Sequence, residues 1–501
     1  MAHTRTLITQ RQSGAVSQAL TRAIGANALM VAGVALGLVH LLLLILGLED
    51  ELVGACAAAS AVMFALIGYA LKRKLVFELS FVIAFAIGNV TSWAYFNYAY
   101  VRFTNFTIGN NHELSAWLTA LLVAGAALGS IVTQRVLGRE TLSPERFQRF
   151  VRRWETLAVT GLTFGLVTLG YLLTGWLNGR WDLPEEEGFG LSYVVRGIGV
   201  IGYTLFLVLG ARLQPPLYSG RSLFALTMAT LVALAQGLSG GRSASVIIIG
   251  VLLVGALFSE LGFRRWLGLA FCLGLTGMLF IALVGDARSR QGFAHGTVSD
   301  RIDAITSAAR DSSEVEDDGD GPLAVMVSRF FEPSGQVVID ETVWSQRYAG
   351  FENFERLLTL LLPKAVAPDK LPINDSSEVL MRDYGFKLSR SFAVPITLLA
   401  DAYRRGGAIW VGLLGLCAGV FMRLLLRWTM LLLGPDLGVM CSCSLIISFG
   451  SEYMNSVLGF LNTMSYTWLK QLVLFAILGI AMRLLGLLAA PSRVVNPSRF
   501  T

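Results

Sequence analysis

The sequence predicts an all-α polytopic integral membrane protein, with about twelve transmembrane helices and one large extracytoplasmic loop. Hydrophobic residues make up 54% of the 501 residues and charged residues only 15%, which is too apolar for a soluble protein of this size. Apolar runs of about 20 residues, long enough to cross a bilayer, recur along the chain. Basic and acidic loops alternate between these runs, as the positive-inside rule requires.

The apolar runs divide the chain into three regions. Residues 1–285 form an N-terminal bundle of about nine predicted helices, residues 286–391 a large loop, and residues 392–501 the C-terminal membrane helices. The predicted crossings lie near residues 26–48, 52–71, 76–96, 115–136, 156–177, 191–212, 222–239, 243–260, 265–285, 392–426, 429–451 and 465–488. The first run lacks a convincing cleavage site, so we interpret it as a retained helix rather than a signal peptide.

The segment 392–426 is longer than one plain crossing and contains Pro395 and several charged residues. Irregular backbone at membrane depth occurs where protein or a watery cavity surrounds it. We therefore expect a short dipping piece over 392–403, followed by a full crossing over 406–426.

The charged loops orient the chain. Basic residues precede the first crossing, acidic residues 49–51 follow it, and basic residues 72–74 follow the second crossing. Because cytoplasmic loops carry the excess of Lys and Arg, the N-terminus is predicted to lie in the cytoplasm. Continued alternation places the large loop, 286–391, outside the cytoplasm.

The large loop has a polar centre and more apolar flanks. Residues 311–321 are acidic and lack apolar anchors, which predicts a flexible bridge. Segments 323–331 and 354–366 have the pattern of amphipathic pieces that lie on the membrane surface or over a cavity. A lid and simple loop packing are both consistent with this pattern.

Arg242 follows the turn 239–241, which contains two glycines, and opens an apolar run. A flexible turn, a guanidinium group and the free amides of a helix N-terminus together suit a phosphate. An arginine that only extends to the membrane interface would give the same pattern.

Four more arginines lie where membrane segments meet the outer side. Arg196 is one turn into its predicted helix, where an unpaired charge is costly, so we expect it to face a cavity or a carboxylate. Arg288 and Arg290 follow the ninth crossing, and Arg329 precedes an apolar pair in the loop. Because guanidinium groups bind phosphate oxygens in bidentate fashion, their convergence suggests a diphosphate ligand. The alternative ligand is an anionic lipid headgroup, which would require fewer converging arginines.

Candidate proton acceptors are Glu332, Asp369, Asp401 and His295. Asp401 is close in sequence to Arg404 and Arg405, so an ion pair also explains its presence. The sequence has no Walker loop, no HExxH motif and no cluster of His and Cys, which favours chemistry without a metal ion or bound cofactor.

Two stretches resemble a known family. The run from Leu362 to Asn374, LPKAVAPDKLPIN, resembles a stretch with proline, aspartate, lysine and asparagine in bacterial oligosaccharide repeat-unit polymerases, the Wzy-type polymerases of O-antigen and exopolysaccharide. The run from Thr397 to Gly407, TLLADAYRRGG, is similar to the segment that follows the long loop in that family. The turn 240–243 resembles the one that opens a helix there. The chain departs from the family at Gly407, where other members carry a larger residue, and in its acidic insert.

The resemblance implies a GT-C-like glycosyltransferase in the bacterial inner membrane, with its active site facing the periplasm. Such enzymes join oligosaccharides carried on undecaprenyl diphosphate by metal-independent, inverting transfer. Both donor and acceptor are then lipid-linked oligosaccharides, and a flippase and a chain-length regulator are implied partners. An O-antigen ligase and a secondary transporter are the alternatives, the transporter because of the helix count and Arg196.

The resemblance and the residues together assign roles. Asp401 is the first candidate for the base that accepts the acceptor hydroxyl's proton, and Glu332 is the second. The expected diphosphate-binding residues are Arg242, Arg288, Arg290, Arg329, Arg404 and Arg196.

Overall fold

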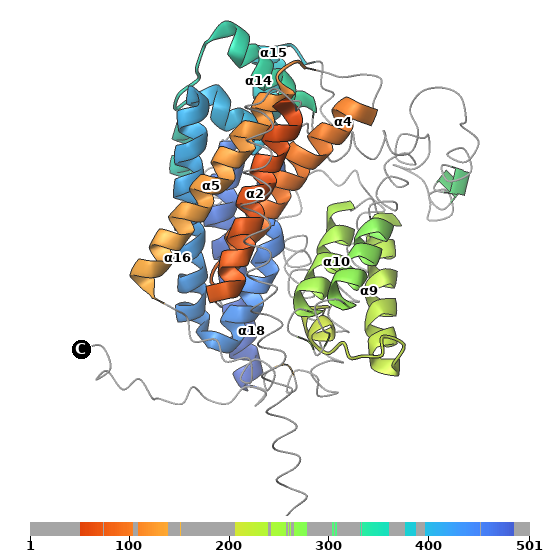
Figure 1. Ribbon diagram of the computed structural model, residues 1–501. Helices are drawn as coiled ribbons and strands as arrows, with labels where there is room; N and C mark the ends of the chain where they lie inside the picture. Colours follow the sequence, from red (N-terminus) through yellow and green to blue (C-terminus); the bar gives the residue numbers. More distant parts are fainter. Residues whose placement is uncertain are drawn as a thin grey trace, which may run out of the picture. The chain divides into compact units, whose positions relative to one another are not determined.

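The structure is a computed structural model. It describes residues 51–73, 75–103, 109–138, 151, 206–238, 242–256, 259, 261, 265–277, 303–304, 306–307, 331, 333–359, 376–386, 396–450 and 452–484. Every regular element in these residues is a helix (Figure 1), which confirms the all-α prediction for this part of the chain. The described residues fall into two compact units, which we treat separately.

Four of the described helices are long and apolar enough to cross a membrane: Glu51–Arg73, His112–Leu137, Leu398–Gly434 and Val457–Ala481. They correspond to the crossings predicted near 52–71, 115–136, 392–426 and 465–488. The chain is therefore an α-helical membrane protein by length and apolar composition of its helices. The crossings predicted at 26–48 and 156–177 lie outside the described residues, and the total of about twelve stays a prediction.

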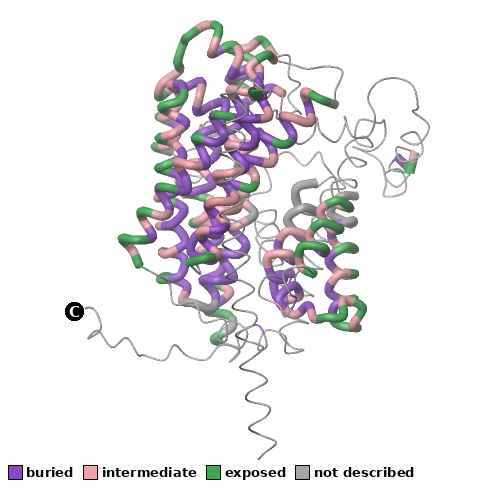
Figure 2. The backbone as a smooth tube through the Cα atoms, viewed as in Figure 1, coloured by how far each residue is buried: buried purple, intermediate pink, exposed green. Residues whose placement is uncertain are grey.

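The first unit is built on the helices α2 (Glu51–Arg73), α3 (Ser80–Val90), η1 (Thr91–Phe96), α4 (Asn97–Phe103) and α5 (His112–Leu137). Helices α3, η1 and α4 follow one another without a break, so helix extends past the crossing predicted at 76–96. Helix α2 packs along α5. Buried residues concentrate where these helices face one another (Figure 2), with Trp93 and Phe85 among the largest fully buried side chains.

Helix α5 also packs closely against α16 (Leu398–Gly450), because small residues face each other across the interface. A Cβ atom at Gly129 would overlap the Leu416 carbonyl, and one at Gly419 would overlap the Ala126 carbonyl. Such small residues let the backbones of membrane helices approach each other. Beyond this interface, α5 ends at Gly138, whose carbonyl accepts a hydrogen bond from Arg423 Nη2 at 3.0 Å.

Glycines with left-handed backbone interrupt α16 at two points. Gly407 has φ +68° and Gly434 has φ +77°. The first lies at the predicted boundary between the dipping piece and the full crossing, and the second separates the apolar helices Leu398–Gly434 and Leu437–Gly450. Residues 398–406 are helical up to Gly407, and residues 392–395 lie outside the described residues, so the dipping piece stays a prediction.

Part of the predicted large loop is folded onto the first unit. It contributes α14 (Pro333–Ser345), η2 (Phe354–Thr359) and α15 (Ser376–Tyr384). Asp340 of α14 accepts hydrogen bonds from the backbone N–H groups of Asn110 at 2.8 Å and Asn111 at 3.0 Å, just before α5 begins. A carboxylate at this position is favourable because the first amides of a helix lack partners within the helix. The predicted acidic bridge over 311–321 lies outside the described residues.

The amphipathic segments predicted in the loop are described only in part. Of 354–366, residues 354–359 form η2, and of 323–331, only Phe331 is described. Two further short elements, η3 (Glu452–Met454) and α17 (Val457–Asn462), follow α16 in this unit, and η4 (Thr463–Thr467) completes it.

The second unit contains α9 (Gly220–Leu238), α10 (Arg242–Ala256), the helical residues 206–211 and 265–277, residues 428–444 of α16 and α18 (Trp468–Leu484). Helices α9 and α10 overlap the crossings predicted at 222–239 and 243–260, although neither is among the four helices long and apolar enough to cross a membrane, and α10 begins at Arg242 as expected. Ser444 Oγ donates to Gln471 Oε1 at 2.7 Å, and Trp468 Nε1 donates to Thr429 Oγ1 at 2.9 Å. These two bonds join α18 to residues 428–444.

Candidate functional site

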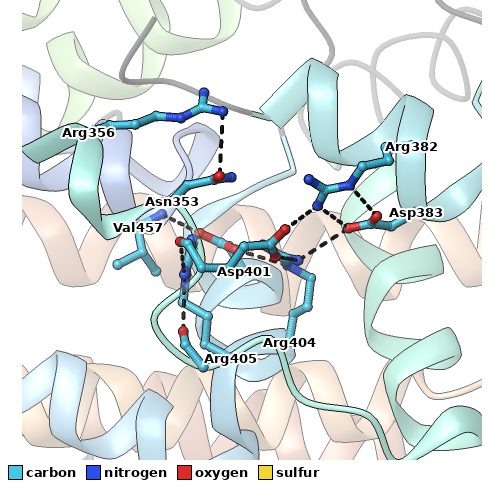
Figure 3. Close-up of polar contacts among 10 residues, drawn as sticks. Asn353, Arg356, Arg382, Asp383, Asp401, Arg404, Arg405 and Val457 are labelled. Atoms are coloured by element: carbon cyan, nitrogen blue, oxygen red, sulfur yellow. Dashed lines mark hydrogen bonds and ion pairs between the residues drawn. The ribbon is translucent and has the colours of Figure 1, made fainter. Parts of the chain in front are cut away.

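The first turns of α16 carry three charged side chains in the buried part of the first unit. Asp401, Arg404 and Arg405 follow the spacing i, i+3 and i+4, which places them on one face of a helix. Arg404 Nε lies 3.2 Å from Asp401 Oδ1, and Arg405 Nε lies 3.2 Å from Asp401 Oδ2 (Figure 3). Asp401 is 1% exposed, Arg404 4% and Arg405 1%. One buried carboxylate therefore holds two buried guanidinium groups.

Asp401 has a third partner on another helix. The backbone N–H of Val457, the first residue of α17, donates to Asp401 Oδ2 at 2.8 Å. Ser456 caps the same helix, since its hydroxyl accepts from Gly459 N at 3.1 Å. A buried carboxylate is tolerated when its oxygens are paired and hydrogen-bonded. Both oxygens of Asp401 are engaged, and the residue links α16 to α17.

The helix break at Gly407 lets the turn 346–354 dock against these arginines. Ala349 N–H donates to the Arg404 carbonyl and Gly350 N–H to the Arg405 carbonyl, each at 3.0 Å. In an unbroken helix these carbonyls would accept from residues four positions later. Gly407 has left-handed backbone just after these two residues, and N–H groups of the turn donate to their carbonyls.

Arg405 is held by the turn as well as by Asp401. Its Nη1 donates to the carbonyls of Gly350 at 3.1 Å and Glu352 at 2.8 Å. Its guanidinium carbon lies 4.9 Å from the centre of the Phe354 ring, a cation–π contact. Nη2 of Arg405 is buried and makes no hydrogen bond to the residues that the structure describes. These contacts fix the orientation of the Arg405 side chain, and its Nη2 can still donate a hydrogen bond to a ligand.

Arg404 connects the buried pair to a more exposed network. Its Nη1 lies 2.7 Å from Glu352 Oε2 and 3.5 Å from Asp383 Oδ2. Glu352 also contacts Arg382, whose Nε lies 2.6 Å from Asp383 Oδ1. The side chain of Arg382 is 46% exposed, whereas Arg404 is buried. The network therefore runs from a solvent-accessible cation to a buried one, and Figure 3 shows Arg404 between Asp401 and Asp383.

A further ion pair ties η2 to α15. Arg356 Nη2 lies 2.8 Å from Glu378 Oε2, and it also contacts Asn353 Oδ1 at 3.5 Å. With this pair the described site holds four arginines and four carboxylates: Arg356, Arg382, Arg404, Arg405, Glu352, Glu378, Asp383 and Asp401. Each of these four arginines is therefore paired with at least one of the four carboxylates.

The pKa values of three side chains of α15 are shifted: those of Arg382, Asp383 and Tyr384. The hydrogen bond from Arg382 lowers the pKa of the Asp383 carboxyl, and attraction to Arg382 and Arg404 adds to this effect. The same hydrogen bond raises the pKa of Arg382. Burial raises the pKa of Tyr384 to about 12. Asp383 is therefore ionised and Tyr384 neutral at physiological pH.

A second buried cluster lies around Phe331. Its ring packs against Tyr100 at 4.9 Å, Trp93 at 5.4 Å and His112 at 5.9 Å between ring centres. His112 Nδ1 lies 2.7 Å from Asn97 Oδ1. The loop residue Phe331 is thus anchored between helices of the first unit, immediately before α14.

No family model matches this chain, and comparisons with curated proteins and with solved structures give no match.

The structure brings together two of the predicted site residues, Asp401 and Arg404. Arg242 begins α10 in the second unit, and its side chain is not among those described. Outside the described residues lie Arg196, Arg288, Arg290, Arg329 and Glu332. In the part of the chain that is described, no group of three or more His, Cys, Asp or Glu could hold a metal ion.

Sequence reasoning missed the partners of Arg404. Glu352 and Asp383 are 52 and 21 positions before it in the sequence, and pairing over such separations leaves no local pattern. A weak signal was present in Arg382 and Asp383, which are adjacent and opposite in charge on a short polar helix. Arg405, which the sequence suggested only as an ion-pair partner, is as fully buried as Asp401.

Proposed function

We propose that this chain is a membrane-embedded glycosyltransferase that polymerises oligosaccharide repeat units carried on undecaprenyl diphosphate at the periplasmic face of the bacterial inner membrane. The observation that carries the proposal is the buried pair Arg404 and Arg405, held by Asp401 at the beginning of a candidate membrane span. This pair lies within TLLADAYRRGG, one of the stretches that resemble repeat-unit polymerases.

The chemistry of a diphosphate leaving group supports arginines at this position. Guanidinium groups stay charged and present several donors in one plane, so they bind phosphate oxygens in bidentate fashion. Two of them in a poorly hydrated site stabilise the negative charge that develops as the glycosyl bond breaks. Burying two guanidinium groups side by side is costly because each loses its hydration, which favours a functional role over a purely structural one.

The position of Glu352 suggests a route by which the diphosphate could reach the arginine pair. Its carboxylate bridges the buried Arg404 and the exposed Arg382, and thus occupies the position that a phosphate group would take between two arginines. In our proposal the diphosphate displaces Glu352, contacts Arg382 first and then reaches Arg404. The Nη2 atoms of Arg404 and Arg405, which have no hydrogen-bond partner among the described residues, supply additional donors in this proposal.

In the proposed reaction, a hydroxyl oxygen of the acceptor sugar attacks the anomeric carbon of the donor. The bond from that carbon to the diphosphate oxygen breaks, the electron pair leaves with the diphosphate, and a carboxylate takes the hydroxyl proton. The attack from the opposite face inverts the anomeric configuration. Arg242, Arg288, Arg290, Arg329 and Arg196 stay predictions from the sequence, and the site proposed in the first unit does not rest on them.

The geometry favours a positioning role for Asp401 over a role as the base. Both of its oxygens accept contacts from arginines, and one also accepts the Val457 N–H. Asp401 is also only 1% exposed, so a substrate hydroxyl would have to displace one of these contacts to reach its oxygens. Glu332, the other candidate predicted from the sequence, is therefore the base that we propose.

The test is the glycan profile of a host strain that lacks this chain, complemented with wild type, Arg404→Lys, Arg405→Lys or the exposed control Arg347→Ala. We expect a ladder of repeat units with wild type and the control, and single repeat units with the null strain and both lysine variants. Lysine retains the charge but not the bidentate geometry.

Other outcomes would assign a different function. Long lipid-linked polymer that never reaches its final acceptor in the null strain would identify a ligase. A null strain with an unchanged glycan profile would exclude both glycosyltransferase functions and favour a transporter.

A further inference from the structure

The turn that docks on the arginine pair presents an exposed aromatic surface. Phe351 is 71% exposed, although its ring packs edge-on against Trp410 at 5.0 Å and Phe354 at 5.4 Å. Tyr348, also exposed, lies over Gly407, where an added Cβ atom would meet its hydroxyl at 3.2 Å. We call Tyr348, Phe351 and Trp410 the aromatic surface. It is joined to α16 at the helix break, immediately beside Arg405.

This aromatic surface continues into an exposed apolar face of α16. Ile409 is 75% exposed, and Leu413 and Leu416 are also exposed. The spacing i, i+4 and i+7 puts these three side chains on one face of the helix. They belong to the candidate membrane span Leu398–Gly434, so an exposed apolar face here is the surface that lipid covers. Trp410 follows Ile409 directly in the sequence and connects this face to Phe351.

The charges of α16 place the aromatic surface at the edge of the bilayer. Residues 406–422, between Arg405 and Arg423, contain no charged side chain. At about 1.5 Å per residue they span roughly 26 Å, close to the roughly 30 Å of a hydrocarbon core. The membrane boundary then falls beside Gly406, over which the Trp410 ring is folded. Trp and Tyr concentrate at such boundaries because their rings are apolar and their tips polar.

We propose that the aromatic surface inserts into the interface of a phospholipid bilayer and anchors the turn 346–354 there. The anchored turn holds the arginine pair at the depth of lipid phosphate groups, through the bonds from Ala349 and Gly350 to the carbonyls of Arg404 and Arg405. A lipid occupant fits better than a glycan or a protein, because the surface is continuous with Ile409 and Leu413. The inference does not depend on the polymerase reaction.

The first experiment is photo-crosslinking in the full chain, reconstituted in nanodiscs of phosphatidylethanolamine and phosphatidylglycerol. Phe351, Leu413 and Glu341 are each replaced by p-benzoylphenylalanine, and the irradiated protein is analysed by mass spectrometry. Leu413 is the positive control in the span, and Glu341 is an exposed residue of α14. We expect lipid adducts at positions 351 and 413, and none at 341. Should position 351 fail to express, position 348 replaces it.

Lipid adducts at 413 without any at 351 would overturn the proposal. So would cross-links from 351 to glycan or to protein when native membranes replace the nanodiscs, because they would show that another molecule covers the aromatic surface.

Amide hydrogen exchange is a second measurement, which does not require p-benzoylphenylalanine in the protein. In Phe351→Glu, the charge keeps the turn out of the interface, so the amides of Ala349 and Gly350 exchange several-fold faster in nanodiscs than in wild type. The conservative control Phe351→Leu retains slow exchange. Equal exchange in the two variants would show that the lipid interface does not anchor the turn.

Discussion

Asp401 accepts the backbone N–H of Val457 at 2.8 Å through Oδ2, the same oxygen that lies 3.2 Å from Arg405 Nε. The two residues are 56 positions apart, so one carboxylate fixes both the orientation of an arginine and the start of α17. A buried charge with this many partners is difficult to remove without loss of structure.

We therefore expect Asp401→Asn to destabilise the protein by about 3–5 kcal/mol, because it removes the carboxylate that pairs with the buried Arg405 and one of the three that pair with Arg404. The control Asp383→Asn removes a more exposed carboxylate from the same network and should cost less than about 1 kcal/mol. Thermal unfolding in detergent measures both. An Asp401→Asn protein with wild-type stability and no activity would contradict the positioning role and support Asp401 as the base.

Glu352 is the residue whose removal should strengthen ligand binding. Glu352→Gln frees Arg404 Nη1 and Arg382 from a competing carboxylate. Affinity for an undecaprenyl diphosphate headgroup should rise about tenfold, the effect of roughly 1.4 kcal/mol. Binding is measured by titration in nanodiscs, with Glu355→Gln, an exposed residue of η2, as the matched control. A fall in affinity in Glu352→Gln alone would show that Glu352 positions the arginines rather than competing for them.

Helices were predictable from the sequence where apolar periodicity was long and uninterrupted. The crossings at 52–71 and 115–136 agree with Glu51–Arg73 and His112–Leu137, because runs of this length have few alternatives to a membrane helix. The loop region was less predictable. Helix α14 depends on contacts between Asp340 and the start of α5, and no local pattern encodes such a contact.

The candidate site was predictable only where its members are close in sequence. Asp401, Arg404 and Arg405 share a helix face through their spacing alone. Glu352 and Asp383 join them through folding of the loop, and the helix break that makes room for the turn 346–354 is marked in the sequence only by Gly406 and Gly407. The sequence thus identified the buried centre of the site and missed its outer partners.

Gly407 should not tolerate a side chain. Its φ of +68° disfavours any L-residue, and a Cβ atom would press against the Tyr348 hydroxyl at 3.2 Å. Gly407→Ala should therefore destabilise the protein by about 1–2 kcal/mol. Gly412→Ala is the matched control, since Gly412 is helical and a Cβ there meets only Leu121 side-chain atoms at 3.5 Å or more. We expect Gly412→Ala to leave the melting temperature unchanged or to raise it. Equal destabilisation by Gly407→Ala and Gly412→Ala would argue against a requirement for left-handed backbone at Gly407.

The ion pair of Arg382 and Asp383 predicts a pH dependence. Because the pKa of Asp383 is lower in the folded protein, the pair contributes stability above the ordinary carboxyl value of about 3.9 and loses it as the pH falls further. Both side chains are partly exposed, so the contribution is less than about 1 kcal/mol. The melting temperature of wild type should exceed that of Asp383→Asn at pH 7, and the difference should shrink below about pH 4. A difference that stays constant over this range would show that Asp383 stabilises α15 by contacts other than its charge.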